Sequence, residues 1–395
     1  MNTKFLGIAL ALGIAFILGG SAGFPSTAEA ARGVCAGPKA DRPPECDDGG
    51  GDGGSGDSGT EGNPSFVYST IGNGGVMRVM DADGSNNRRL SQIAATYAIR
   101  GPTPHWGPAG QEVAWADWKH NRWSGIVVVR LDGSPHPVGD LLCAGETSCL
   151  LFEDSDEFEA GGPLDWGVPG CIQDSNSNDR FIAFRGRGYF DVNNPDQIVE
   201  DVFLINRENP ATSIDELINV TNTSNERVNG LAWSDDSQRI AVYATSEANP
   251  WGQSGNIAII DVCNGFSKSE ISLPEGHAIQ RVLFLDWGKQ SNGMDYIAVT
   301  TTGGVWIVEV VTDPSAPPTP RQIVTIGPQA NQFTDPFHAV WSPDATEMAV
   351  AYGDSNGGAA IAILNVTDVS NPYLVRTISV GKPAGNIDWR LEDIP

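Results

Sequence analysis

The chain has 395 residues, of which 49 are acidic and 24 basic, so its formal net charge is −25. A field of this sign repels nucleic acid and anionic lipid, because binding to either requires clustered Lys and Arg side chains. We therefore expect neither as a partner.

Residues 1–30 have the pattern of a secretory signal peptide. Lys4 gives a positive start, residues 5–18 form an apolar run, and Ala28 and Ala30 mark a small-residue cleavage site. The apolar run is shorter than the roughly 20 residues that cross a membrane. We therefore expect an exported protein, periplasmic or secreted, without membrane insertion. Lipid anchoring at Cys35 is the alternative, but the residues before it differ from a lipoprotein signal.

Residues 31–63 are expected to form a flexible linker. The stretch 47–62 contains only Gly, Asp, Ser, Thr and Glu, and no apolar side chain. Such a composition cannot bury a core and leaves the backbone free. Its acidic residues could bind cations, but a solvated spacer is the simpler interpretation.

From residue 64 onward, a tryptophan recurs six times in nearly the same local sequence. The clearest copies begin His105-Trp-Gly-Pro-Ala-Gly-Gln, Trp233-Ser-Asp-Asp-Ser-Gln and Trp341-Ser-Pro-Asp-Ala-Thr. The six anchor tryptophans are Trp106, Trp166, Trp233, Trp287, Trp341 and Trp389. Their intervals run from 48 residues (Trp341 to Trp389) to 67 residues (Trp166 to Trp233). These values lie at or above the repeat length of propeller blades.

Short β-rich runs between turn residues predict four strands, a to d, in each repeat. The tryptophan ends strand a, and an Ile/Val-Ala-Val run forms strand b. Asn256–Asp261 and Gly304–Glu309 are typical of strand c, and a shorter strand d follows. Asp83-Gly84 is a strong signal for the turn between strands c and d.

The two ends of this region predict a composite blade. Gly385–Trp389 reads as a strand a with no strand b after it, whereas Ser65–Ser69 reads as a strand b with no tryptophan before it. Pairing the two would close a ring and remove the free sheet edges. Five whole repeats and one split repeat predict an all-β, six-bladed propeller over residues 64–395.

These repeats resemble those of TolB-like six-bladed β-propellers, which have WD-like repeats. The resemblance rests on Val79-Met-Asp-Ala-Asp-Gly-Ser-Asn-Asn-Arg-Arg-Leu90 and on Pro104-His-Trp-Gly-Pro-Ala-Gly110. It covers residues 64–395 and implies the fold without implying an activity. TolB carries an α/β domain before its propeller, whereas only the linker precedes it here. A role in Tol-type envelope transport is therefore not expected.

Six cysteines are an even number, as in proteins that fold in an oxidising compartment. They allow 15 complete pairings. We expect Cys35 with Cys46, Cys143 with Cys149, and Cys171 with Cys263. The first two pairs close short loops. The third joins an a–b loop to a c–d loop of the next blade, and these loops share one face of a propeller. A zinc site is the alternative, but no two cysteines have the spacing of a zinc knuckle.

The anchor tryptophans have two interpretations. They could stack on a sugar ring, but we expect each to wedge between blades and bury its large apolar surface. His105 and His338 fall in strand a, near the propeller axis. We interpret both as core histidines, with a ligand-binding role as the alternative.

Long b–c and d–a loops predict a ligand-binding surface on the opposite face. The candidate residues are Trp118, His120, Trp123, Arg185, Arg187, Tyr189 and Trp251. Loose aromatic side chains on loops commonly mark recognition surfaces. The alternative is that they pack over the acidic insertion 153–159, whose carboxylates would pair with the two arginines.

Asp174, Asn176 and Asn178 place oxygen ligands at alternate positions, as a calcium loop does. Asp179 stands where an EF-hand has glycine, and Arg185 stands where it has the bidentate glutamate. An ordinary turn is therefore the alternative. No other cofactor is expected.

Together these features predict an exported, monomeric binding or interaction module for a protein or glycan partner. The alternative is an extracellular hydrolase or lyase that uses the axial pocket, with or without a metal. The sequence contains neither the H-E-x-x-H motif of zinc hydrolases nor a Walker phosphate loop. That favours the binding module.

Overall fold

The computed structural model describes most of the region predicted to form the propeller. The described residues are 64–70, 77–90, 103–108, 110–119, 122–132, 148–153, 158–172, 179–188, 199–209, 211, 213–223, 226–246, 256–271, 282–301, 304–310, 321–325, 336–353, 359–380 and 384–389. The chain divides into two units, Met1–Glu61 and Gly62–Pro395. The predicted signal peptide and the linker lie outside the described residues, so both stay predictions.

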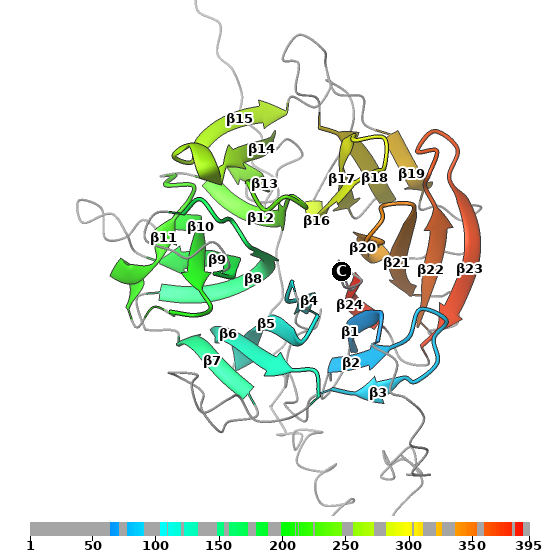
Figure 1. Ribbon diagram of the computed structural model, residues 1–395, viewed down its shortest axis with the longest axis horizontal. Coiled ribbons are helices and arrows are strands. Elements are labelled where there is room, and N and C mark those ends of the chain that lie inside the picture. Colours follow the sequence, from blue (N-terminus) through cyan, green and yellow to red (C-terminus); the bar gives the residue numbers. More distant parts are fainter. Residues whose placement is uncertain are drawn as a thin grey trace, which may run out of the picture. The chain divides into compact units, whose positions relative to one another are not determined.

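Six four-stranded antiparallel sheets surround a central axis (Figure 1). Blade 1 contains β4 (His105–Trp106), β5 (Glu112–Lys119), β6 (Arg122–Arg130) and β7 (Ser148–Glu153). Blade 2 contains β8 (Phe158–Gly167), β9 (Phe181–Gly188), β10 (Val199–Asn206) and β11 (Ile218–Asn219). Blade 3 contains β12 (Glu226–Trp233), β13 (Arg239–Ser246), β14 (Asn256–Asp261) and β15 (Ser267–Ile271).

Blade 4 contains β16 (Val282–Lys289), β17 (Asp295–Thr301), β18 (Gly304–Glu309) and β19 (Arg321–Thr325). Blade 5 contains β20 (Pro336–Trp341), β21 (Glu347–Gly353), β22 (Ala359–Asn365) and β23 (Tyr373–Ser379). Blade 6 combines β24 (Ala384–Trp389) with β1 (Phe66–Thr70), β2 (Met77–Met80) and β3 (Arg88–Arg89). Two short 3-10 helices, η3 (Ile214–Glu216) and η4 (Val262–Asn264), complete the described elements. Within these residues no helix is long and apolar enough to cross a membrane.

The composite blade confirms the predicted closure of the ring. Strand order in blade 6 is β24-β1-β2-β3, and Phe66 is the Cα partner of Trp389 across the β1–β24 ladder. The rings of these two residues also pack together, with centroids 4.6 Å apart. Figure 1 shows the red C-terminal strand beside the blue N-terminal strands. Segments from the two ends of the propeller region therefore share one sheet.

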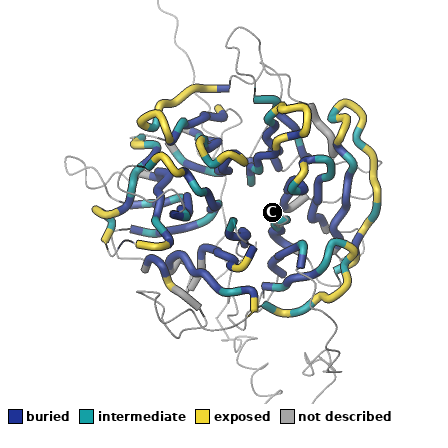
Figure 2. The backbone as a smooth tube through the Cα atoms, in the orientation of Figure 1, coloured by how far each residue is buried: buried dark blue, intermediate teal, exposed yellow. Residues whose placement is uncertain are grey.

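Burial along each blade follows from its position between two neighbours. Strands b and c are covered on both faces, so β14 (Asn-Ile-Ala-Ile-Ile-Asp) carries a continuous apolar run instead of an alternating one. The outer strands β15 and β23 are mostly exposed. Figure 2 shows this change from buried inner strands to an exposed rim.

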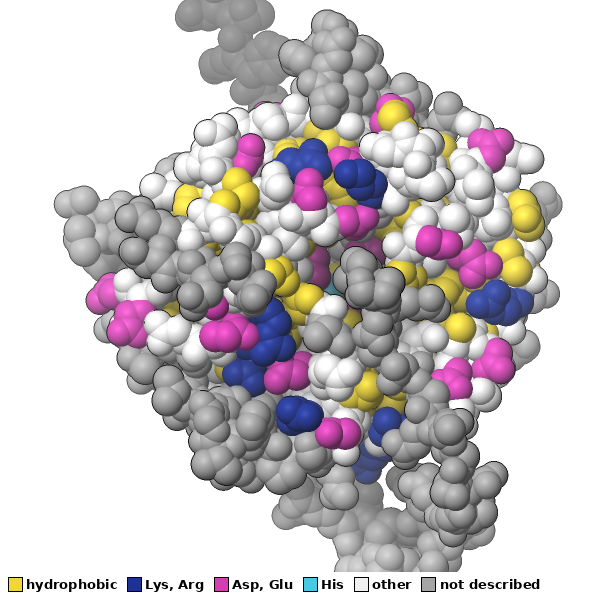
Figure 3. Space-filling model, viewed as in Figure 1, with side chains coloured by type: hydrophobic (Ala, Val, Ile, Leu, Met, Phe, Trp, Pro, Cys, Tyr) yellow, Lys and Arg dark blue, Asp and Glu magenta, His cyan; other side chains and the backbone are white. Residues whose placement is uncertain are grey.

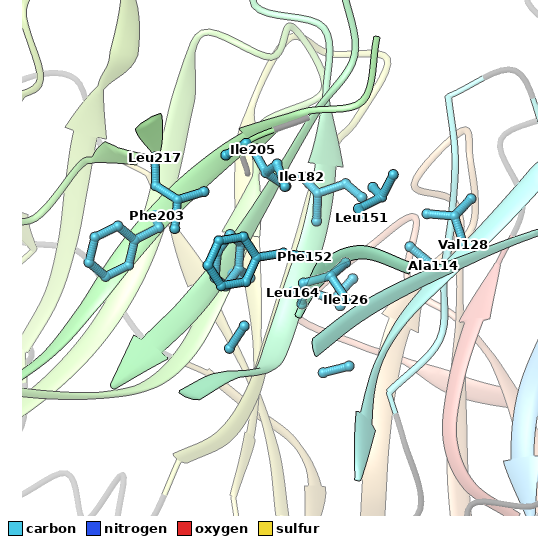
Figure 4. Packing of buried hydrophobic residues seen from close by; sticks show 14 of the residues in the cluster. Ala114, Ile126, Val128, Leu151, Phe152, Leu164, Ile182, Phe203, Ile205 and Leu217 are labelled. Carbon is cyan, nitrogen blue, oxygen red and sulfur yellow. The ribbon is translucent and has the colours of Figure 1, made fainter. Parts of the chain in front are cut away.

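The core is a series of apolar clusters at the seams between adjacent blades. The largest joins blades 1 and 2, where Ile126, Val128 and Phe152 face Leu164 and Phe203 (Figure 4). Equivalent clusters lie at the five other seams among the described residues. Stability is therefore spread around the ring, because no blade can bury its two faces alone.

The anchor tryptophans wedge between blades, as predicted. A Cβ atom placed on Gly167 would lie 2.6 Å from the ring of Trp233, and one placed on Gly288 would lie 2.6 Å from the ring of Trp341. Each of these glycines directly follows the tryptophan of the preceding blade. The absence of a side chain lets the next indole lie directly on the backbone. Trp233 and Trp341 are accordingly only 4% exposed.

The predicted disulfide between Cys171 and Cys263 is present, with Cα atoms 5.3 Å apart across 92 residues of sequence. Cys171 follows the a–b turn of blade 2, and Cys263 lies in η4, between strands c and d of blade 3. The bond therefore joins neighbouring blades on the same face. Cys35, Cys46 and Cys143 lie outside the described residues, as does the side chain of Cys149, so their pairings stay predictions.

We expect Trp341→Ala to lower the free energy of unfolding by roughly 3–5 kcal/mol, because it removes a buried ring and leaves a cavity. Tyr373→Ala is the matched control, since this aromatic side chain is 60% exposed. Its effect should stay within about 0.5 kcal/mol. Urea unfolding measures both variants, and equal losses would contradict the wedge.

We expect the double substitution Cys171→Ser with Cys263→Ser to cost roughly 2–4 kcal/mol, because the unfolded chain loses a long covalent loop. Denaturant unfolding without reductant measures the loss. Peptide mapping of the unreduced wild-type protein is the companion experiment. A peptide linking Cys171 to a different cysteine would show the pairing to be wrong.

Candidate binding site

A cavity of about 350 Å³ lies at the axial end of the inner strands. All six anchor tryptophans line it, together with Asp165, Asp235, Asp286 and Asp388. Turn residues that follow the tryptophans, including Pro108, Ser234 and Pro343, complete its wall. The cavity, called the axial pocket below, therefore belongs to the face formed by the a–b loops. Figure 3 looks onto one face of the propeller, where acidic side chains gather around the central hollow.

Three of these carboxylates come from alternate blades, where an aspartate directly precedes the anchor tryptophan. Asp165 lies near the end of strand a of blade 2. Its Oδ1 accepts a hydrogen bond from the backbone N–H of Trp166 at 2.7 Å, and its Oδ2 accepts one from the backbone N–H of Trp233 at 2.7 Å. One carboxylate therefore ties the inner strands of blades 2 and 3 together.

The same bridge recurs at two other seams. Asp286 in blade 4 accepts the backbone N–H of Trp341 in blade 5 at 2.6 Å. Asp388 in blade 6 accepts that of Trp106 in blade 1 at 2.7 Å. Each aspartate lies in strand a, one residue before the tryptophan, so the repeat itself puts the carboxylate within reach of the next strand.

Two arginines fasten two of the remaining seams and cover the anchor rings. Arg180 in blade 2 donates to Glu112 in blade 1 at 2.8 Å and lies 5.9 Å from the ring of Trp166. Arg239 in blade 3 donates to Asp295 in blade 4 at 2.7 Å and lies 5.0 Å from the ring of Trp287. In both places a guanidinium group contacts an indole and a carboxylate together.

The histidines of strand a are buried, as their interpretation as core residues predicts. His338 accepts the backbone N–H of Ile387 through Nδ1 at 3.2 Å and packs on Phe284. His105 lies with Nδ1 3.6 Å from Asp165 and 3.8 Å from Asp388. Burial lowers the pKa of His105 to about 3, and that of His338 well below its usual value, so both rings are neutral at physiological pH.

The axial carboxylates have pKa values displaced in the opposite direction. Burial raises the pKa of Asp165 to about 7, even though it accepts two backbone hydrogen bonds. Burial first, and then repulsion from the neighbouring carboxylates, raises the pKa of Asp286 and of Asp388 well above the usual range. The pKa of Asp235 rises to about 6 for the same two reasons. The pocket therefore favours the protonated form of these carboxyl groups unless a cation compensates their charge.

The residues predicted to bind a ligand lie elsewhere, toward the b–c face. Trp118 and Trp123 are Cα partners at the end of the β5–β6 hairpin. Arg187 in β9 lies 3.8 Å from Glu159 and 3.8 Å from Glu200. This ion pair agrees with the alternative interpretation, in which the arginine pairs with the acidic insertion. Burial lowers the pKa of Arg185, and the charge of Glu200 opposes that shift.

Several predicted site residues cannot be placed. His120, Tyr189 and Trp251 lie outside the described residues, as do Asp174, Asn176 and Asn178 of the proposed calcium loop. The side chains of Trp118 and Trp123 are also not described. The ligand-binding and calcium predictions therefore stay predictions.

Sequence reasoning did not identify the axial carboxylates. Their signal was present, because Asp-Trp occurs in three of the six repeats, at Asp165, Asp286 and Asp388. Among the described residues, no group of three or more His, Cys, Asp or Glu side chains is placed to hold a metal ion. The three aspartates thus form a ring of separate charges.

The chain resembles solved structures only at low sequence identity. No family model matches the chain, and no curated protein matches its sequence. Among solved structures, TolB from Acinetobacter baumannii is 13% identical over 82% of this chain and 66% of its own, with a TM-score of 0.47. A chain of a nidogen/laminin complex is 10% identical over 82% of this chain and 97% of its own, with a TM-score of 0.49. The periplasmic gluconolactonase of Pseudomonas aeruginosa is 11% identical over 82% and 98%, with a TM-score of 0.44.

We expect the free energy of unfolding to fall as pH rises from about 4 to about 7. Folded Asp165 keeps a proton up to about pH 7, whereas the unfolded chain releases it near the usual 3.8. The native state therefore binds more protons in this window, and the loss for Asp165 alone is on the order of 4 kcal/mol. Asp235, Asp286 and Asp388, whose folded pKa values are also raised, act in the same direction. His105 and His338 oppose it below about pH 6.5, because their folded pKa values are lowered and only the unfolded chain takes up a proton there. The four carboxylates outnumber the two histidines, so the net slope keeps its sign.

Urea unfolding between pH 5 and 8 measures this slope. Asp165→Asn should flatten it, although the variant also loses one acceptor for the two backbone N–H groups. Asp215→Asn, at an exposed acid in η3, is the matched control and should keep the wild-type slope. A slope in Asp165→Asn equal to that of the control would contradict the assignment.

Proposed function

We propose that the protein is an exported binding module that recognises a protein or glycan partner at its axial pocket. The observation that carries this proposal is the composition of the pocket, in which six indole rings surround separate carboxylates at the centre of a closed ring of blades. Five of the six tryptophans are almost fully buried between the blades and form rigid walls, and the few fixed polar groups supply specificity. A pocket held by six seams is also organised before the partner arrives.

Export is supported by two features of different kinds. The sequence begins with the pattern of a signal peptide, and the Cys171–Cys263 disulfide is a bond that persists in oxidising compartments. We therefore propose a periplasmic or extracellular location.

An enzyme that uses the axial pocket is the alternative. The pKa of Asp165, about 7, suits a general acid or base, whereas the pKa of buried His105, about 3, does not. Asp165, Asp286 and Asp388 already accept hydrogen bonds from backbone N–H groups at the seams, and such fixed acceptors favour a binding surface. The predicted surface at the b–c loops, on the opposite face, is retained as a second contact region.

The test uses two substitutions at Pro343, which lines the pocket within the turn closed by the Ala345 N–H and the Ser342 carbonyl. Pro343→Arg should fill the pocket with a long cationic side chain. Pro343→Ala keeps the pocket open and costs only about 0.4–1 kcal/mol of stability. Both variants and the wild type are immobilised and exposed to the extracellular fraction of the source culture.

Bound proteins are identified by mass spectrometry and bound glycans after release. We expect a species that the wild type and Pro343→Ala retain and that Pro343→Arg loses at least tenfold. Equal retention by all three would place recognition outside the axial pocket. No specific retention by the wild type would contradict the binding module itself.

A further inference from the structure

Asp165, Asp286 and Asp388 have no Lys or Arg partner among the described residues, whereas Asp235 lies near Lys289. No described Lys or Arg lies within ion-pair distance of Asp165, Asp286 or Asp388, and the one basic ring beside them is neutral His105. Asp165 and Asp388 nevertheless keep 19% and 16% of their side-chain surface exposed. Each carboxylate is already fixed by backbone N–H groups. A cation entering the pocket would therefore meet acceptors that need little rearrangement.

Two arginines of the protein show which cation is favoured beside an anchor tryptophan and a carboxylate. Arg180 combines an ion pair to Glu112 with a contact to the ring of Trp166. Arg239 combines an ion pair to Asp295 with a contact to the ring of Trp287. Trp166 and Trp287 also line the axial pocket, beside carboxylates that lack such a guanidinium group. The pocket thus contains indole rings and carboxylates, as the surroundings of Arg180 and Arg239 do, but no guanidinium group of the described residues contacts Asp165, Asp286 or Asp388.

A guanidinium group fits this arrangement better than an ammonium group or a neutral sugar. It is planar, weakly hydrated and always charged, so it packs against the small part of the indole rings that lines the pocket and donates to two carboxylates at once. A neutral sugar could stack on the rings but would leave the buried negative charge uncompensated. The cavity of about 350 Å³ is at the small end of ligand sites, which suits one long side chain. The net charge of −25 would also steer a basic partner toward the protein.

We propose that the axial pocket binds the guanidinium group of an arginine side chain presented by a protein partner. This inference rests on the proposed function and specifies the partner for the same pocket. Asp165, Asp286 and Asp388 face the group from three alternate blades around the axis, and the more exposed Asp235 adds a fourth carboxylate to the pocket wall.

Two peptides that differ in one group test the proposal on the full-length protein. The probe is acetyl-Gly-Arg-Gly-amide, and its control contains citrulline, which has the same shape without the charge. Titration calorimetry gives the affinity, and the indole N–H resonances of the protein report contact with the anchor rings. We expect the arginine peptide to bind at least about tenfold more tightly than the citrulline peptide and to shift indole resonances. Its affinity should fall as salt is raised.

Two pocket variants and one control locate the site. Asp286→Asn removes an axial carboxylate and also weakens a seam contact. Asp235→Asn, at the more exposed carboxylate, keeps an amide oxygen for the backbone N–H of Lys289 and is the variant that disturbs the fold less. Each should weaken the arginine peptide by about fivefold or more. Glu270→Gln removes the same charge from the outer strand β15 and should leave the affinity unchanged.

Equal binding of the two peptides would overturn the proposal, as would wild-type affinity in Asp235→Asn. Absence of binding by either peptide would also overturn it, and so would displacement of the arginine peptide by a neutral oligosaccharide. These results are distinct from failure of the proposed function. A partner that is retained by Pro343→Ala and lost by Pro343→Arg would still show a recognition module, one that uses a different ligand chemistry.

Discussion

The pairing of β24 with β1 is the constraint on which the rest of the structure depends. An open array of six sheets would leave the inner strand of one blade and the hairpins of another with unpaired backbone groups. The Phe66–Trp389 register joins these ends within one sheet, so every blade acquires two neighbours. Only then can the apolar faces of strands b and c be covered on both sides. Closure also fixes the axis toward which the ends of all six inner strands point.

All six seams around this axis share the same apolar packing, but the polar interactions that join the blades differ from seam to seam. Aspartates bridge blades 2 to 3, 4 to 5 and 6 to 1 through backbone N–H groups. Arginine–carboxylate pairs join blades 1 to 2 and 3 to 4, and His338 reaches blade 6 from blade 5. The aspartates thus hold the ring together and also place negative charge in the pocket. Structure and proposed recognition rest on the same side chains, so a substitution there must be tested for both.

This double role explains the electrostatic state of the pocket. Burial and mutual repulsion raise the pKa values of Asp165, Asp286 and Asp388, so these carboxyl groups hold protons. A guanidinium group would compensate their negative charge better than protons do. A bound cation and a bound proton relieve the same repulsion, and they are therefore expected to compete. The charge of the chain as a whole acts at longer range and favours a basic partner.

The sequence by itself determined the number of blades, the composite blade and the Cys171–Cys263 bond. These features follow from local patterns, namely the recurring tryptophan, the apolar runs and the turn signals. Strands such as Asn256–Asp261 and Gly304–Glu309 could be delimited directly, because a strand buried on both faces leaves a continuous apolar run between polar ends. Only the tertiary structure decided where the charges meet. Asp165, Asp286 and Asp388 lie far apart along the chain and come together because the closed ring directs strand a of every blade toward one axis. Their burial, which raises their pKa values, exists only in the closed ring.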